Sequence, residues 1–205
     1  MGKDYGRRRP VRPMQNRVLI LCAGETDEVY FKALRENLGS LENVTVKVSA
    51  AKHSEPEKVV SEAVGMSDLY DFLWCVFDYD NSPHYDEAIK NAEQNRKVHC
   101  AFSNMAIEFW FLLHFENCTG AMSVKLLEER LGKHLAQKYS KKTNGFKAIC
   151  KKILSTNTQS VAEERARMLH EKYIRDQSGS PPSQWQSSTT VYKLTKELAQ
   201  WSEAN

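Results

Sequence analysis

The 205-residue sequence lacks any long apolar run, and this absence argues against a membrane-spanning helix. No stretch approaches the roughly 20 consecutive apolar residues that such a helix needs. The basic N-terminal segment 1–16 has no apolar stretch behind it, so it does not have the pattern of a signal peptide. We expect this segment to be a flexible basic tail, either a solubilising end or an arm that contacts RNA.

Cysteine is scarce as well, and the few cysteines are far apart. There are five of them: Cys22, Cys75, Cys100, Cys118 and Cys150. An odd number at such spacing predicts neither a disulfide framework nor a zinc knuckle. We therefore expect a reducing compartment and place the protein in the cytoplasm. The six histidines show no metal-ligand spacing, and the sequence has no glycine-rich phosphate loop, so we do not predict a nucleoside triphosphatase.

What the sequence does contain is enough apolar material for a packed core, in segments that alternate. Hydrophobic residues make up 41% of the chain, which argues against disorder. Apolar strand segments are predicted at 17–22, 44–48, 72–77 and 97–102, and helices at 27–39, 54–66, 86–95 and 106–116. Strands that alternate with helices pair in parallel through crossover connections. We predict an α/β core over residues 17–118, with a parallel sheet of about four strands and helices on both faces.

The pattern becomes helical after residue 118. We predict helices near 123–131, 145–154, 159–176 and 189–202, which together form a helical C-terminal region over 119–205. Within this region, segment 125–152 has nine lysines and arginines against two glutamates. The net charge of the whole chain is only +3, so this segment concentrates positive charge locally.

Three groups of acidic residues follow predicted strands. They are Glu25, Asp27 and Glu28 after the first strand, Asp78 and Asp80 after the third, and Glu108 after the fourth. In open parallel sheets, ligands bind beyond the carboxyl ends of the strands, so all three groups map to the edge where a ligand is expected.

The pair Asp78 and Asp80 points to a divalent cation. Residues two apart on an extended backbone project to the same side, and two carboxylates there repel unless a cation or a shared proton lies between them. Magnesium suits such a pair, because it binds through one or two carboxylates and keeps several waters. The alternative is a strand-ending turn, in which aspartate is common.

Glu108 and the first acidic group each have a structural alternative. Glu108 lies in an apolar helix, where an unpaired carboxylate is costly, so it must reach a cation, a donor or a salt bridge to Lys or Arg. Ser103 and Asn104 are expected to cap this helix. For the first acidic group, the alternative is helix capping, with Thr26 as N-cap and the acids favoured by the helix dipole.

The basic segment 125–152 is a candidate surface for a phosphodiester substrate. A metal would act at the scissile phosphate while lysines contact the backbone on either side. The candidate contacts are Lys138, Lys141, Lys142 and Lys147. The alternative is that these lysines form an ordinary solvated surface.

Three motifs resemble the RloB family. They are "CAGETDEVYF" (22–31), "VFDYD" (76–80) and "SNMAIEFWFLLHF" (103–115), with weaker likeness at "KYSKK" (138–142) and "SSTTVYKLTKEL" (187–198). The resemblance implies a Toprim-like, magnesium-binding domain and an effector of bacterial anti-phage defence. It also implies a Mg²⁺- or Mn²⁺-dependent nuclease acting on DNA or RNA, such as tRNA, with an ATPase partner encoded nearby.

The sequence departs from the family pattern in the first motif. The glutamate that usually precedes the glycine is replaced by Ala23, while Asp27 fills the second acidic position and Glu108 of the third motif is retained. We expect Asp27, Asp78, Asp80 and Glu108 to hold metal, and Glu25, Asp27 and Glu108 to serve catalysis, with Glu25 substituting for the missing glutamate. The alternative is a catalytically weakened module that binds nucleic acid or an ATPase without cutting.

Overall fold

The computed structural model describes residues 15–39, 41, 44–177 and 179–203. The predicted basic tail lies outside the described residues up to position 14, and the first strand begins at Asn16. The described strands are β1 (Asn16–Cys22), β2 (Val44–Ala50), β3 (Phe72–Asp78), β4 (Val98–Asn104) and β5 (Ser188–Thr189). The described helices are α1 (Glu25–Leu38), α2 (Pro56–Gly65), α3 (Tyr85–Glu93), α4 (Glu108–Leu113), α5 (Val124–His134), α6 (Thr143–Leu154), α7 (Gln159–Asp176) and α8 (Val191–Glu203), with a short 3-10 turn, η1, at Pro182–Gln184.

The strands form one sheet in the order β2-β1-β3-β4-β5. The first four strands are parallel, which confirms the predicted core. The fifth strand is antiparallel to β4, with Ser103 opposite Thr189 and Asn104 opposite Ser188. The sequence predicted a polar loop up to 188 and a helix from 189, with no strand, because a two-residue strand carries no periodic signal.

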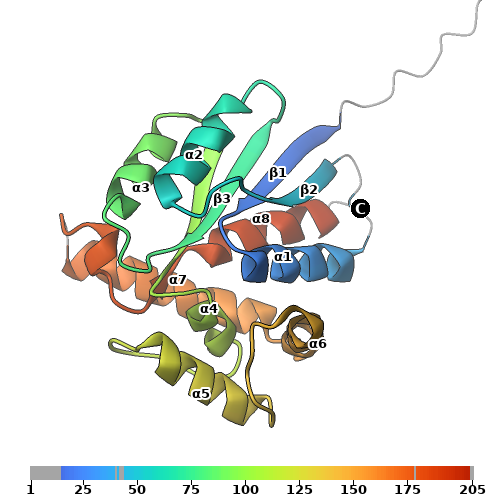
Figure 1. Ribbon diagram of the computed structural model, residues 1–205, viewed down its shortest axis with the longest axis vertical. Coiled ribbons are helices and arrows are strands. Elements are labelled where there is room, and N and C mark those ends of the chain that lie inside the picture. The colour runs from blue at the N-terminus through green and yellow to red at the C-terminus, as the bar shows by residue number, and fades with distance from the viewer. Residues whose placement is uncertain (1–14, 40, 42–43, 178, 204–205) are drawn as a thin grey trace, which may run out of the picture.

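Helices cover both faces of the sheet, as predicted. Val18 and Ile20 of β1 face one apolar cluster, and Leu19 and Leu21 face the other, because successive side chains of a strand point to opposite sides. Helices α2 and α3 lie on one face, and α1 and α8 lie on the other (Figure 1). The central strands are therefore buried on both sides, which explains their continuous apolar runs.

The C-terminal region packs onto the sheet and shares its core. Phe146 of α6 and Leu194 of α8 belong to the same buried apolar cluster as Ile20 of β1. Helices α4 to α7 lie beyond α1 and α8, farther from the sheet (Figure 1). Ser202 Oγ donates to the carbonyl oxygen of Leu38 at 3.0 Å, joining the end of α8 to the end of α1. Residues from far along the chain are thus brought into the core beside β1 and against the end of α1.

Within the described part of the chain, no helix combines the length and the apolar character needed to cross a membrane.

A candidate metal centre at the carboxyl edge of the sheet

The carboxyl ends of β1, β3 and β4 meet at one edge of the sheet, and acidic residues follow each of them. A cavity of about 260 Å³ opens at this edge. It is lined by Ala23, Gly24, Asp27, Ser54, Glu55, Pro56, Asp78, Tyr79, Asp80 and Ser82. Two of the three predicted acidic groups therefore contribute side chains to a single cavity, at the place where parallel sheets bind ligands.

Asp27 is buried in the first turn of α1, with only 4% of its surface exposed. One carboxylate oxygen, Oδ2, accepts a hydrogen bond from the backbone N–H of Gly24 at 3.2 Å. Gly24 is the N-cap, so the expectation that Thr26 caps the helix is wrong; Asp27 reaches back to the chain before the helix instead. Burial, followed by the negative charge of Glu108, raises the pKa of Asp27 to about 7.

Asp78 is the last residue of β3 and lies opposite Ser103 of β4. Burial, followed by the charges of Asp27 and Glu108, raises the pKa of Asp78 well above its ordinary value. A hydrogen bond from the backbone of Ile107 and the charge of Lys141 oppose this shift. The cavity edge therefore resists holding several carboxylates in the charged state unless a cation is added.

Asp80 also lines the cavity, but it reaches it from a turn and not from the extended strand that was predicted. Its φ angle is +39°, in the left-handed region, so it belongs to a turn and not to the extended strand that holds Asp78. The inference that the two side chains share one face of a strand is therefore wrong. Asp80 is exposed at the rim, and Tyr79 between the two acids packs against the ring of Tyr85, with centroids 5.0 Å apart.

Glu108 is completely buried and begins helix α4. The predicted caps of this helix are wrong: its N-cap is Ile107, and Ser103 and Asn104 end strand β4. The Asn104 side-chain amide donates instead to the carbonyl oxygens of two residues in the 182–183 turn. Glu108 therefore stands at the first position of its helix and not one turn inside, which brings it to the carboxyl end of β4.

The two oxygens of Glu108 have different surroundings. Tyr139 Oη donates to Glu108 Oε1 at 2.7 Å, and Lys141 Nζ lies 2.9 Å from the same oxygen. The other oxygen, Oε2, is buried and makes no hydrogen bond within the described part of the chain. The salt bridge that was the alternative for Glu108 does form, and it occupies only half of the carboxylate.

Lys141 is a cation that faces this acidic cluster. Burial lowers its pKa, but the charges of Glu108, Asp78 and Asp27 outweigh burial, and the net effect is a raised pKa. The "KYSKK" segment therefore reaches the acids through its tyrosine and its second lysine. No sequence signal connects Tyr139 to Glu108, since 31 residues separate them and the contact depends on how α5 and α6 pack.

The remaining predicted residues lie outside this cluster. Glu25 is exposed at the first position of α1 and does not line the cavity. Lys138 and Lys142 are exposed, whereas Lys147 lies 3.6 Å from Glu36 in a surface ion pair. The structure therefore joins Lys141 to the acids and leaves the other three predicted lysines on the surface.

The chemistry of these side chains fits a hard divalent cation. In the described ranges, no three His, Cys, Asp or Glu side chains lie together in a way that could hold one metal ion. Magnesium, however, needs only one or two carboxylates and keeps several waters. The unpaired Glu108 Oε2 is an acceptor without a donor. The pKa values of Asp27 and Asp78 are raised first by burial and then by neighbouring carboxylates, and a cation would relieve both effects.

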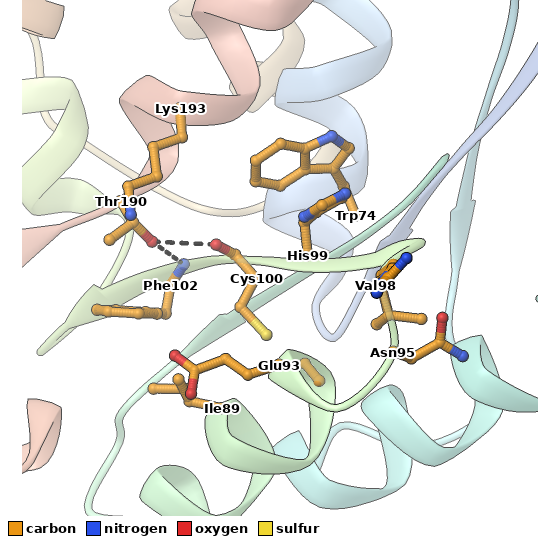
Figure 2. A pocket seen from close by; sticks show the side chains of 12 residues that line it. Trp74, Ile89, Glu93, Asn95, Val98, His99, Cys100, Phe102, Thr190 and Lys193 are labelled. Carbon is orange, nitrogen blue, oxygen red and sulfur yellow. Dashed lines mark hydrogen bonds between the residues drawn. The ribbon is translucent and has the colours of Figure 1, made fainter. Parts of the chain in front are cut away.

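Two further cavities lack this arrangement. One, of about 280 Å³, lies between α3, β4 and α8 and contains Glu93 and Lys193 but none of the predicted site residues (Figure 2). There the Thr190 hydroxyl accepts from the N–H of Phe102 and donates to the carbonyl oxygen of Cys100, along the outer edge of β4. The other, of about 490 Å³, lies along α5 and the loop that follows, and its lining includes Lys125, Lys133, Lys138 and Tyr139.

Comparison with known proteins gives one family match. The family described as "RloB-like protein" matches residues 18–198, which is most of the chain and includes all three acidic groups. No curated protein and no solved structure matches the chain. By the extent of this match, the chain belongs to the RloB-like protein family.

Proposed function

We propose that this RloB-like protein is a divalent-metal-dependent nuclease that hydrolyses phosphodiester bonds of DNA or RNA, tRNA included, in bacterial anti-phage defence. The observation that carries the proposal is the position of Asp27, Asp78 and Glu108 near the carboxyl edge of one parallel sheet, where burial, and after it the neighbouring carboxylates, raises the pKa of both aspartates. Buried like charges are costly, and sites that keep them are commonly functional.

Asp27 and Asp78 would hold Mg²⁺ or Mn²⁺ in the cavity, with Asp80 at its rim. Glu108 is not among the residues that line this cavity, and its free Oε2 would bind a second ion or orient a water beside it. A bound ion of this kind activates water and neutralises charge on the scissile phosphate. We further propose that residues 17–118 form a Toprim-like domain, a view supported by four parallel strands with acids at their carboxyl ends.

The substrate backbone would contact the exposed lysines beside the acids. Lys138 and Lys142 flank Lys141 and present their side chains to solvent. Phosphate contacts by Lys position a nucleic acid without reading its sequence, so this surface supports a phosphodiester polymer as substrate and does not select between DNA and RNA.

Calorimetric titration with MnCl₂ tests the metal site, and incubation with plasmid and tRNA tests cleavage. We expect wild-type protein to bind Mn²⁺, and the double variant Asp78→Asn, Asp80→Asn to lose that binding. Cleavage should need Mg²⁺ or Mn²⁺ and stop with EDTA. Equal Mn²⁺ binding by wild type and double variant would contradict the proposal.

A second function has one observation in its favour. Position 23 is alanine, and Glu25, the candidate replacement for the family's glutamate, lies outside the cavity. A cavity with one carboxylate fewer supports a module that binds nucleic acid or an ATPase partner without cutting. Binding of Mn²⁺ and of nucleic acid with no cleavage of plasmid or tRNA would favour this second function.

A further inference from the structure

Glu108 is held by donors that come from a distant part of the chain and engage only one of its oxygens. Tyr139 and Lys141 both contact Oε1, while Oε2 is buried with no hydrogen bond from any described residue. Because a buried acceptor without a donor is costly, this half-satisfied state is not the arrangement that stability alone would favour. Because one oxygen is fixed by two donors, the other oxygen is the one that remains for a ligand to bind.

The loop that supplies these donors, residues 135–142, connects α5 to α6 and is fixed by contacts with both helices. Its tyrosine, Tyr139, is 6% exposed and packs edge-on against Phe146, with ring centroids 6.2 Å apart. At the start of the loop, Lys152 of α6 donates a hydrogen bond to the carbonyl oxygen of Leu135. The hydroxyl of Tyr139 is therefore delivered to Glu108 from a fixed ring and not from a mobile side chain.

Gly132 of α5 makes this mounting possible. The N–H of Gln137 bonds to the carbonyl oxygen of Gly132 at 3.1 Å, so the loop folds directly back on the helix. A Cβ atom at position 132 would lie 3.2 Å from the carbonyl oxygen of Gln137 and 3.6 Å from the nitrogen of Tyr139. Any larger residue at this position would push the backbone that supports Tyr139.

We propose that Tyr139 and Lys141 are positioning residues, which fix Glu108 through Oε1 so that Oε2 faces the divalent cation. This inference rests on the proposed function, because it needs a metal at the acidic edge. Hydrogen bonds to a metal-binding carboxylate set its orientation, and their loss typically lowers metal affinity ~10- to 100-fold. Lys141 adds a positive charge beside a fully buried glutamate, which would otherwise face two aspartates without a counter-ion.

The test is Tyr139→Phe, which removes the hydroxyl and changes no charge. The matched control is Tyr192→Phe, which also removes a buried hydroxyl, in this case one hydrogen-bonded to His170 at 3.1 Å. By Mn²⁺ calorimetry, we expect Tyr139→Phe to raise Kd ~10-fold and Tyr192→Phe to leave it within a factor of about two. The electron paramagnetic resonance line shape of bound Mn²⁺ should change in Tyr139→Phe only, which a purely structural role would not produce.

A second pair of variants tests the mounting of the loop. Gly132→Ala crowds the backbone beneath Tyr139, whereas Gly145→Ala adds its methyl group where no atom lies within 4 Å. Both replace a helical glycine with alanine, which favours the helix in each case. We expect Mn²⁺ affinity to fall about threefold in Gly132→Ala, because a displaced Tyr139 would orient Glu108 less well. The affinity should stay unchanged in Gly145→Ala.

The outcomes separate this inference from the function on which it rests. Mn²⁺ binding by wild type with an unchanged Kd and line shape in Tyr139→Phe would overturn the positioning role and leave the metal site standing. An absence of Mn²⁺ binding in wild type would overturn both. A Tyr139→Phe protein that keeps the wild-type Tm without metal but binds Mn²⁺ weakly would support the inference directly.

Discussion

Two buried glutamates differ in their hydrogen-bond partners: Glu108 at the carboxyl edge of the sheet and Glu163 between α7 and α8. Glu163 of α7 accepts two hydrogen bonds on its Oε1, from the Gln159 amide at 3.1 Å and from the Thr195 hydroxyl at 2.8 Å, and both donors are neutral. Glu108 accepts from a tyrosine and a lysine on one oxygen, and its other oxygen is buried without a hydrogen bond among the described residues.

Each glutamate thus binds its donors through one oxygen, and the two differ in the charge of one donor and in the burial of the second oxygen. Glu163 links α7 to α8, and no oxygen of Glu163 is among the buried unpaired acceptors found in the described residues. After burial, the charge of Glu108 contributes to raising the pKa of Asp27 and of Asp78, so its region holds like charges close together. Such repulsion weakens the metal-free fold, and a bound cation would turn it into attraction.

The largest expected effect comes from neutralising each glutamate in turn. Glu108→Gln keeps an oxygen for Tyr139 but removes the charged ligand, so we expect Mn²⁺ affinity and any cleavage rate to fall ~100-fold. Glu163→Gln keeps an acceptor for Thr195, so Mn²⁺ affinity and cleavage rate should each stay within a factor of about three of the wild-type values. Mn²⁺ calorimetry and a plasmid or tRNA cleavage assay measure the two variants side by side. Equal losses would mean that Glu108 is as structural as Glu163.

The next effect is a gain in the free energy of unfolding when a buried acid at the carboxyl edge of the sheet is neutralised. Burial raises the pKa of Asp27 to about 7 in the folded state, so the folded protein binds a proton at this group more tightly than the unfolded chain does. The contribution of Asp27 to the free energy of unfolding therefore falls as pH rises from about 4 to 7. Above about pH 7 the buried group is charged, and the destabilisation has reached its full size. In EDTA at about pH 8, Asp27→Asn should raise the free energy of unfolding by about 2 kcal/mol.

Urea denaturation at several pH values checks the sign of this effect. The advantage of Asp27→Asn over wild type should shrink as pH falls and vanish near about pH 4, where folded Asp27 is protonated and the unfolded group begins to be. Buried His114 has the opposite trend, because burial lowers its pKa to about 4 and stability is lost as pH falls below its ordinary range. Comparing variant with wild type at each pH cancels that contribution. A constant advantage across pH would exclude the buried charge as its cause.

A smaller effect is expected from restoring the missing carboxylate of the first motif. Ala23 follows β1, lines the cavity and lies four positions before Asp27. Ala23→Glu should tighten Mn²⁺ binding about tenfold, because the affinity of a hard-cation site follows the number of charged ligands. Glu25→Gln should have no effect, since Glu25 is exposed outside the cavity. If Glu25→Gln instead abolished binding in calorimetry, Glu25 would have to move into the site.

The smallest effect concerns the lysines around the acidic edge. Lys138→Gln and Lys142→Gln should each weaken binding of tRNA or plasmid severalfold and reduce the salt slope by about 0.9 for each phosphate that the variant no longer binds. Lys172→Gln, on an exposed position of α7 outside the basic segment, is the control. Filter-binding titrations at several salt concentrations give the slopes. Unchanged slopes in both test variants would show that these lysines only solvate the surface.

Most of the sheet and the positions of the acids could be predicted from the sequence. Continuous apolar runs marked β1 and β3, and their alternation with amphipathic segments indicated parallel strands. Carboxyl ends of parallel strands share an edge, so Asp27 and Asp78 were expected near each other before any contact was known. The turn at Asp80 was harder to predict, because a left-handed φ angle after a strand leaves no sequence signature beyond the turn-forming residues around it.

The sequence by itself determined the alternation of strands and helices, the edge at which acids gather and the family to which the chain is similar, because these follow from local periodicity and short motifs. Only the tertiary structure decided that Glu108 begins its helix and that Tyr139 and Lys141 meet it. It also decided that β5 extends the sheet beyond β4 and that Glu25 stays outside the cavity. These contacts depend on how elements far apart in the chain pack against one another, and packing leaves no periodic trace in the residues that it joins.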